Sequence, residues 1–530
     1  MKPKQILVCG KIAKEGLDTL LACKDLKVDV VTDLSFENLK KIIPTYHGMI
    51  VRSDTQVTNA LLEAAQNLQV IVRAGIGIDN VDVKAATQKG ILVMNTPSGN
   101  VITTAEHALS MLMALSRNIP QATASMKQGL WEKKKFIGTE LFGKTLGVIG
   151  LGNVGKIVAD RAQGLKMKVI AYDPFLSKEV AKKLSVELVS LDVLLSRADF
   201  VTVHVPLSDK TRNLIDAKAL SKMKPSAFLI QCARGGIVNE ADLYKALQKQ
   251  KIKGAALDVF EEEPPTQNPL LQLNNLICTP HLGASTEEAQ VKVGVETAEQ
   301  LVAYFLKGTI QNAINMPSLS SEQMDILKPY FILAEKLGSF LGQVIEPGRI
   351  LAIEIGYHGK LTEYNLNTLT HAIVTGFLRE HMEKSVNYVN SLLVAKDRGI
   401  DVKTTRFQDE SEFTNLISLR VRTEQRVYSV KGTIFNRAEP RFVQIDQFQL
   451  EAIPEGNILF SRNKNKPGVI GAIGTLLGKE KINISRFQLG LDEKAGEALS
   501  LINVDSPIQK DLLEKLLKLD HILTVKRVSL

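Results

Sequence analysis

The chain has 530 residues, of which 45% are hydrophobic and 23% are charged, as is usual for soluble globular proteins. Because a single hydrophobic core stops growing near about 250–300 residues, this length predicts three or four domains. The formal net charge of +9 is spread along the chain, with basic clusters only at 133–135 and 462–466. This spread argues against a nucleic-acid-binding face, and the clusters indicate solvated surface or a contact for a small anionic substrate.

The cysteines and the N-terminus bear on the cellular compartment. The four cysteines lie far apart without CxxC spacing, so we expect neither a metal site nor a disulfide framework. The N-terminus runs straight into the expected strand 5–9 without the pattern of a signal peptide, and no apolar run reaches membrane-spanning length. We therefore expect a cytoplasmic protein that binds no membrane.

Short apolar segments alternate with amphipathic ones through about residue 315, which is typical of parallel βαβ units. Strands are expected in a first series at 6–8, 28–31, 48–51, 70–72 and 91–93, and in a second series at 144–149, 168–173, 200–205, 227–230, 254–257 and 276–278. The helical run 286–306 would cross back to the first series. The prediction is therefore two Rossmann-like α/β lobes: a discontinuous first lobe, 1–97 with 286–315, and a second lobe, 98–285.

A glycine-rich loop with three spaced glycines, Gly150, Gly152 and Gly155, follows the strand 144–149 and precedes a helix expected from Lys156. Gly150 permits a tight turn, Gly152 lets the backbone approach a pyrophosphate, and Gly155 allows close helix packing. The next strand ends at Asp173, where a carboxylate can accept hydrogen bonds from ribose hydroxyls and repel a 2′-phosphate. The pattern predicts NAD rather than NADP. The alternative is that Asp173 only ends a strand before Pro174.

Three later residues supply a cation, a carboxylate and an imidazole: Arg234, Glu263 and His281. Oxidation of a 2-hydroxy acid needs a base for the hydroxyl proton, which His281 can provide. Glu263 can orient the imidazole, and Arg234 can bind the substrate carboxylate through two hydrogen bonds. The alternatives are that His281 is a loop histidine and that Glu263 belongs to a solvated charge run.

Two arginines, Arg52 and Arg73, follow strands of the first lobe, and glycines after Arg73 expose backbone amides. Guanidinium groups and free amides together suit a doubly anionic substrate. The alternative is that both arginines form surface ion pairs.

Taken together, the segments 73–82, 150–155, 232–236, 257–265 and 280–285 resemble the D-isomer-specific 2-hydroxyacid dehydrogenases. The resemblance covers nearly the whole chain. It implies the oxidation of D-3-phosphoglycerate to 3-phosphohydroxypyruvate with NAD, the first step of the phosphorylated route to L-serine.

The resemblance also implies roles for individual residues. Catalytic roles fall on Arg234, Glu263 and His281. Cofactor contacts fall on Gly150, Gly152, Asn153, Val154, Gly155, Asp173, Cys232, Asp258, Gly283 and Ala284, and substrate contacts on Arg52, Ser53, Arg73, Gly75, Asn100 and Lys133. The helix 102–117 and the segment 131–136 resemble a dimer-forming region. We therefore expect a homodimer or homotetramer in which Lys133 reaches the substrate phosphate of a neighbouring subunit.

The C-terminal third differs in pattern from the two lobes. Residues 316–452 resemble the α+β intervening domain of the long form of these dehydrogenases, which is allosteric and substrate-binding in type. Residues 453–530 read strand, helix, two strands, helix and strand, which resembles a ferredoxin-like ACT regulatory domain. Asn463 and Asn465 stand where such a domain would bind serine as an effector. The alternative is a purely structural assembly domain.

Two other functions stay open from the sequence. One is the reduction of another 2-keto acid, such as glyoxylate or hydroxypyruvate. The other is a non-catalytic nucleotide-sensing scaffold. The pair Arg52 and Arg73 argues against the first, and the joint presence of Arg234, Glu263 and His281 argues against the second.

Overall fold

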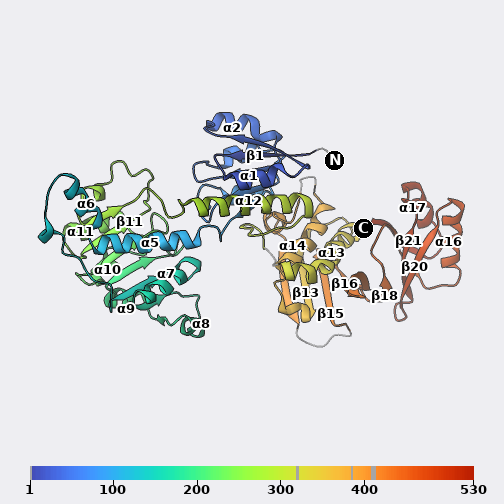
Figure 1. Cartoon of the computed structure of the whole chain (residues 1–530). Helices are drawn as coiled ribbons and strands as arrows, with labels where there is room; N and C mark the ends of the chain where they lie inside the picture. Colours follow the sequence, from blue (N-terminus) through green and yellow to red (C-terminus); the bar gives the residue numbers. More distant parts are fainter. Residues whose placement is uncertain (1–2, 318–320, 383–385, 408–412) are drawn as a thin grey trace. The chain divides into compact units, whose positions relative to one another are not determined.

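The computed structural model describes residues 3–317, 321–382, 386–407 and 413–530 (Figure 1). The chain divides into two compact units: one comprises Met1–Lys11, Thr19–Asn95 and Thr297–Leu530, and the other Ile12–Asp18 and Thr96–Glu296. Among the described residues, no helix combines the length and the apolar character that crossing a bilayer requires.

The first sheet has five parallel strands in the order β2-β1-β3-β4-β5, a doubly wound arrangement. Buried apolar residues fill most of the four inner and far-edge strands, as expected from the sequence, whereas in the other edge strand, Leu26–Val31, only Leu26 is buried. The strands are β1 (Lys4–Cys9), β2 (Leu26–Val31), β3 (Gly48–Val51), β4 (Val70–Arg73) and β5 (Leu92–Asn95); the helices between them are α1 (Lys14–Leu21), α2 (Phe36–Ile42), α3 (Asn59–Ala64) and α4 (Val83–Gln88).

The chain returns to the first sheet after the second lobe, as predicted. Helix α12 (Glu287–Lys307) leads back, and the backbone amide of Ile314 then donates to the carbonyl oxygen of Val93 in β5 (2.8 Å). The side chain of Asn315 accepts from the amide of Val93 (2.9 Å) and donates to the carbonyl oxygen of Ile91 (2.8 Å). The first lobe is therefore built from two separate parts of the sequence.

The second sheet has seven parallel strands in the order β12-β11-β10-β9-β6-β7-β8. This is the strand order of a dinucleotide-binding fold with one added edge strand. The strands are β6 (Thr145–Ile149), β7 (Lys168–Tyr172), β8 (Glu187–Leu188), β9 (Phe200–Val203), β10 (Phe228–Gln231), β11 (Gly254–Leu257) and β12 (Leu276–Cys278).

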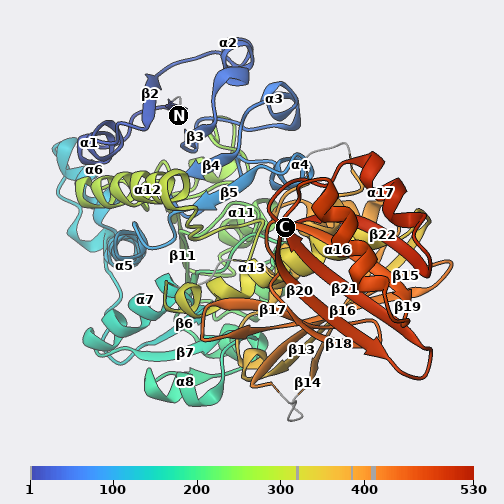
Figure 2. The ribbon, with the colours of Figure 1, turned by 90° about the vertical axis from the view of Figure 1, so that its right-hand side faces the viewer.

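Helices pack on this sheet over two apolar clusters (Figures 1 and 2). Ala105, Leu109 and Leu112 of α5 meet the sheet near the stacked rings of Phe200 and Phe228, whose centroids lie 5.1 Å apart. The helices are α5 (Val101–Ser116), α6 (Ile119–Lys127), α7 (Asn153–Gly164), α8 (Lys178–Lys183), α9 (Leu191–Arg197), α10 (Ala217–Lys222) and α11 (Glu240–Gln248). The sequence analysis did not predict α6.

The third sheet is mixed and has the order β14-β13-β15-β16-β17-β18, which confirms the α+β pattern expected of the intervening region. Two helices pack closely beside it: a Cβ atom at Gly376 of α14 would lie 2.2 Å from the carbonyl oxygen of Glu335 in α13. The elements are α13 (Ser321–Val344), β13 (Ile350–Gly359), α14 (Asn367–Arg379), α15 (Ser391–Asp397), β14 (Asp401–Phe407), β15 (Asn415–Thr423), β16 (Val427–Phe435), β17 (Glu439–Ile445) and β18 (Phe448–Ala452).

The fourth sheet is antiparallel with the order β20-β21-β19-β22, and α16 and α17 cover one of its faces (Figures 1 and 2). Its strand and helix order confirms the ferredoxin-like pattern predicted from the sequence. The elements are β19 (Asn457–Lys464), α16 (Val469–Lys479), β20 (Ile484–Asp492), β21 (Glu497–Val504), α17 (Lys510–Leu517) and β22 (Ile522–Ser529).

The other face of the fourth sheet joins the core of the intervening region. Phe460, Leu499 and Val528 are buried in one cluster with Phe340 of α13, and the rings of Phe340 and Phe460 lie 6.1 Å apart. The sequence analysis did not predict this shared core.

Candidate functional site

The glycine-rich loop has the geometry of a phosphate-binding turn. Gly150 has a φ of +92°, a conformation that side chains with a Cβ atom rarely adopt. A Cβ atom at Gly155 would lie 2.0 Å from the carbonyl oxygen of Gly150, whereas a Cβ atom at Gly152 would meet open space. Helix α7 begins at Asn153, three residues earlier than expected, so Asn153, Val154 and Gly155 form its first turn. The backbone amides of this turn suit a pyrophosphate, so these residues fit NAD.

Asp173 is tied to the glycine loop. One carboxylate oxygen accepts a hydrogen bond from the amide of Leu151 and the other accepts from the amide of Phe175, both at 2.9 Å. Each oxygen has a second lone pair, so the carboxylate can still accept from a hydroxyl group of the cofactor. The strand-ending role and the ribose role of Asp173 are therefore compatible.

Further residues of the site follow the carboxyl ends of neighbouring parallel strands, where ligands of such sheets bind. Cys232 follows β10 and Asp258 follows β11. Burial raises the pKa of the Cys232 thiol, which therefore stays uncharged. The amide of Gly283 donates to Asp258 (2.8 Å), and Ala284 comes next in the same loop.

Glu263 and His281 lie together although 18 positions separate them in the sequence. Glu263 Oε2 lies 2.8 Å from His281 Nδ1, and Glu263 Oε1 accepts from the amide of Phe260 (3.0 Å). Burial by itself raises the pKa of Glu263, but the hydrogen bonds from His281 and Phe260 outweigh it and lower the pKa below its ordinary value. The ionised carboxylate can only accept, so Nδ1 carries the proton and Nε2 is left as the basic atom.

The loop that carries Arg234 packs against the loop that carries Glu263. A Cβ atom at Gly235 would lie 1.9 Å from the carbonyl oxygen of Phe260, so only glycine allows this approach. Arg234 Nη1 donates to the carbonyl oxygen of Ala233 (2.6 Å). Arg234, Glu263 and His281 all belong to the unit that includes residues 96–296.

Gln231 also shapes this loop, and the sequence analysis did not identify it. Its side chain donates to the carbonyl oxygen of Arg234 (2.9 Å) and accepts from the amide of Ala233 (3.1 Å). The sequence does contain one indication that Gln231 is functional, because its amide side chain ends a strand that is otherwise apolar.

The expected substrate contacts divide between the two units. Asn100 and Lys133 belong to the unit of His281. Asn100 precedes α5, and its buried Oδ1 has no hydrogen-bond partner among the described residues. Lys133 is exposed in a short 3-10 helix, Lys133–Lys135.

The other four contacts, Arg52, Ser53, Arg73 and Gly75, belong to the other unit. Val51 and Arg73 are paired in the neighbouring parallel strands β3 and β4. Arg52 and Arg73 therefore lie together at the carboxyl ends of these strands. A Cβ atom at Gly75 would lie 1.7 Å from Arg73 Nη1, so glycine makes room for this guanidinium. That these residues meet His281 on one substrate stays a prediction.

The two expected effector residues differ in exposure. Asn463, at 4% exposure, lies in β19, and its Nδ2 donates to the carbonyl oxygen of Lys464 (2.8 Å). Asn465 is exposed in the following loop, and its backbone amide donates to the carbonyl oxygen of Gly496 (2.9 Å).

Comparisons with known proteins agree with this arrangement. Residues 109–283 match the NAD binding domain of the D-isomer specific 2-hydroxyacid dehydrogenases, residues 326–446 match the D-3-phosphoglycerate dehydrogenase intervening domain, and residues 457–521 match the ACT domain. The D-3-phosphoglycerate dehydrogenase of Synechocystis sp. is 42% identical over 527 residues, which cover 99% of this chain and 95% of that protein. The chain belongs to the D-3-phosphoglycerate dehydrogenase family.

Other relatives agree with this assignment. The D-3-phosphoglycerate dehydrogenase of Methanocaldococcus jannaschii is 42% identical over 99% of this chain and all of its own length. A solved D-lactate dehydrogenase from Aquifex aeolicus, complexed with NAD and lactic acid, is 28% identical with a TM-score of 0.54, over 59% of this chain and 100% of its own. This member of the D-3-phosphoglycerate dehydrogenase family is an NAD-dependent oxidoreductase with an ACT domain, and neither alternative function is favoured.

Proposed function

We propose that this chain oxidises D-3-phosphoglycerate to 3-phosphohydroxypyruvate, with His281 as the base. The observation that carries the proposal is the 2.8 Å contact between His281 Nδ1 and Glu263 Oε2. The chain that makes this contact is 42% identical, over nearly its whole length, to D-3-phosphoglycerate dehydrogenases from two organisms.

The base step follows from the geometry of the pair. His281 Nε2 accepts the proton of the C2 hydroxyl group while the carbon–oxygen double bond forms. The Glu263 carboxylate stabilises the imidazolium that develops and holds the ring in one tautomer. The hydride on C2 would leave to NAD, which supplies the oxidant when it is bound. The first turn of α7 and Asp173 would hold its pyrophosphate and ribose.

Arginines would recognise the two anionic ends of the substrate. Arg234 leaves the loop beside Glu263, where its planar guanidinium can hold the carboxylate of the substrate and polarise the oxygen on C2. Arg52 and Arg73, at one edge of the first sheet, suit the phosphate, together with Ser53 and the backbone at Gly75. The buried Oδ1 of Asn100 suits a hydroxyl donor.

A substrate panel tests this proposal. NADH formation is followed at alkaline pH with D-3-phosphoglycerate, D-lactate, D-glycerate and 2-hydroxyglutarate, at equal concentrations. We expect the highest kcat/KM with D-3-phosphoglycerate. A higher value with a substrate that lacks phosphate would contradict the roles of Arg52 and Arg73.

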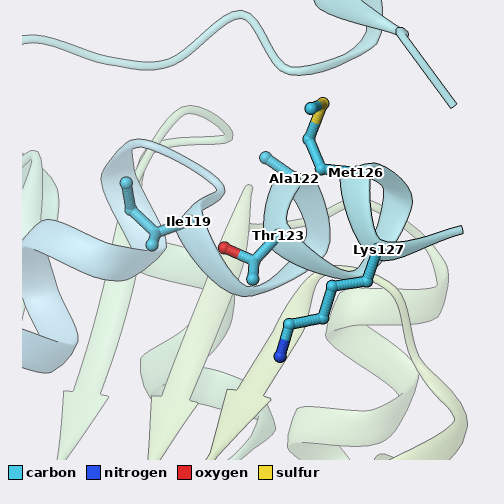
Figure 3. A pocket seen from close by; sticks show the side chains of 5 residues that line it. All are labelled: Ile119, Ala122, Thr123, Met126 and Lys127. Atoms are coloured by element: carbon cyan, nitrogen blue, oxygen red, sulfur yellow. The ribbon is translucent and has the colours of Figure 1, made fainter. Parts of the chain in front are cut away.

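We also propose that two copies of the chain pair through α6 and the segment that follows it. Ile119, Ala122 and Met126 point the same way from α6 and, with Thr123 and Lys127, line an open hollow of about 390 Å³ (Figure 3). The next segment exposes Trp131 (81%), Ile137 (78%) and Phe142 (72%). Apolar side chains gathered in this way are usual at protein–protein interfaces, and pairing would bring Lys133 to the neighbouring subunit.

We further propose serine as the effector, bound at Asn463 and Asn465, because an end product suits a regulatory domain on a first pathway step. The test measures the rate with and without serine in the wild type, in Asn463→Ala and in Asn483→Ala, an exposed asparagine elsewhere in the same domain. We expect inhibition that is lost only in Asn463→Ala. Equal rates with and without serine in the wild type would leave an assembly role for the ACT domain.

The domain limits and the compartment complete the proposal. We propose a first lobe of residues 1–97 with 286–315 and a second lobe of residues 98–285. The intervening domain would then comprise residues 316–452, and the ACT domain residues 453–530. Reciprocal hydrogen bonds between the backbones of Gly456 and Leu530 (2.8 and 3.0 Å) support a boundary near 453. All four cysteines are free, which suits the reducing cytoplasm.

A further inference from the structure

His107, on α5, makes two polar contacts that the proposed chemistry does not use. Its Nε2 lies 3.1 Å from Asp258 Oδ1 and 3.1 Å from Thr279 Oγ1. Ala105, Leu109 and Leu112 of the same helix are buried in the apolar cluster of the second sheet. Thr104, also on α5, donates its hydroxyl to the carbonyl oxygen of Gly283 (3.1 Å). His107 and Thr104 therefore both reach from α5 to the loop after β12, and His107 is the one that we find in contact with Asp258.

Asp258 is the centre of these contacts, and its side chain is fully buried. Its Oδ1 accepts from Thr279 Oγ1 (2.6 Å) and from the amide of Leu282 (2.7 Å), and its Oδ2 accepts from the amide of Gly283 (2.8 Å). The backbone carbonyl oxygen of Asp258 accepts from the amide of His281 (2.9 Å). One residue thus holds the loop 279–283 on both sides of His281.

His281 needs this support because of its own backbone. Its φ is +55°, in the left-handed region that a residue with a Cβ atom occupies only when its surroundings hold it there. The hydrogen bonds that Thr279 Oγ1 and the amide of Leu282 donate to Asp258 fix that conformation, and with it the direction in which the imidazole leaves the loop.

The charge on Asp258 in turn depends on its donors. Burial by itself raises the pKa of Asp258, but the hydrogen bonds from His107, Thr279 and the amide of Leu282 outweigh it and lower the pKa. A buried carboxylate that loses a donor is less well compensated. Among these donors His107 alone comes from outside the loop and its strand, so it ties Asp258 to the helix layer, beside the hydrogen bond from Thr104 to Gly283.

We propose that His107 is a positioning residue that fixes the loop of His281 through Asp258. This inference rests on the proposed function of His281 as the base. A merely structural histidine would lower the stability of the protein without changing the rate of the folded enzyme, so the two roles are separable.

The test compares three variants with the wild-type full-length chain. His107→Leu removes the polar contact, and His107→Gln keeps a side-chain N–H that can donate to Asp258. Glu106→Gln is the control, because Glu106 is exposed on the same helix and pairs with Arg161 (2.7 Å). Steady-state rates with D-3-phosphoglycerate and NAD are measured below the unfolding temperature of each variant.

For His107→Leu we expect kcat to fall at least tenfold while KM for NAD stays within threefold, and we expect His107→Gln to recover most of the loss. Hydrogen exchange at the amides of Leu282 and Gly283 should become faster in His107→Leu and stay as in the wild type in Glu106→Gln. This second measurement does not depend on turnover.

If His107→Leu does not fold, Thr279→Val takes its place, since it removes one donor to Asp258 at nearly equal volume. A kcat within twofold of the wild type, or a change in KM for NAD alone, would overturn the positioning role. An inactive wild type would instead contradict the proposed function, so the two failures are distinguishable.

Discussion

The Asp173 carboxylate accepts a hydrogen bond from the backbone amide of Leu151, the residue between Gly150 and Gly152, at 2.9 Å. The end of β7 thereby holds the turn that follows β6. A carboxylate at this position supports the phosphate-binding loop as well as any contact to the ribose.

Asp173→Ala is therefore expected to act in two ways. It removes the charge that would repel a 2′-phosphate, so the ratio of kcat/KM for NAD to that for NADP should fall at least tenfold. It also leaves the Leu151 amide without its partner, which should cost about 1–3 kcal/mol of stability in a partly buried loop. Both are measured, by kinetics and by denaturation, against Asp160→Ala, an exposed carboxylate on α7. Unchanged cofactor preference would contradict the ribose role.

His281→Ala should lower kcat by about two to four decades and leave the affinity for NAD nearly unchanged, because a general base is lost while the glycine loop is intact. The affinity is measured by titration with NADH fluorescence. Turnover at the wild-type rate would rule out His281 as the base.

Glu263→Gln should lose less activity than His281→Ala, because it removes only the orienting charge. The neutral amide can present either its oxygen or its NH2 group to Nδ1, so the imidazole is no longer held in one tautomer. Glu262→Gln, the exposed neighbour, is the matched control. Equal kcat values for both variants would contradict the pairing of Glu263 with His281.

His204 predicts how stability depends on pH. It follows β9, its Nε2 lies 2.9 Å from Thr202 Oγ1, and burial lowers its pKa to about 4. Between the unfolded value near 6.5 and this value, the unfolded chain binds a proton that the folded chain does not. The free energy of unfolding should therefore fall on acidification, by up to about 1.4 kcal/mol per pH unit.

The measurement is urea denaturation at several pH values between 7 and 4.5. His204→Asn should show a shallower slope than the wild type over this range. The exposed His521 gives the control, His521→Asn, which should keep the wild-type slope. Equal slopes for the wild type and His204→Asn would contradict the neutral state of the partly buried His204.

The exposed face of α6 predicts the oligomeric state. A charged residue in an apolar interface is costly, so Met126→Glu should halve the mass of the assembly in sedimentation or light scattering at micromolar concentration. Val180→Glu is the control, because Val180 is an exposed apolar residue on α8. A wild type that sediments as a monomer would exclude pairing through α6.

The core shared by α13 and the fourth sheet predicts the behaviour of truncated chains. Deletion of residues 453–530 would expose Phe340, which is fully buried and lies 6.1 Å from Phe460. We expect this form to aggregate or to unfold at a lower temperature than the wild type. Deletion of residues 316–530 removes both partners, so the remaining lobes should stay soluble and oxidise substrate. Equal stability of the first truncated form and the wild type would contradict the shared core.

The sequence by itself determined the two parallel sheets and the phosphate-binding turn. Both depend on local patterns: the alternation of short apolar strands with amphipathic helices, and the spacing of Gly150, Gly152 and Gly155. The same holds for the fourth sheet, where the order of strands and helices predicted for residues 453–530 is the one observed. Apolar residues of β21 are buried on both faces of the sheet: Leu499 and Leu501 belong to the core shared with the intervening region, and Ile502 and Val504 belong to the cluster under α16 and α17.

Only the tertiary structure decided which polar groups meet. Residue types made Glu263 and His281 candidates for a pair, but their 2.8 Å contact depends on how the loops after β11 and β12 pack. Nothing in the apolar sequence of α5 distinguished His107 from a packed histidine, because its partner Asp258 lies 151 positions further along the chain. Local propensity sets the elements, whereas contacts across such distances follow from the packing of whole layers.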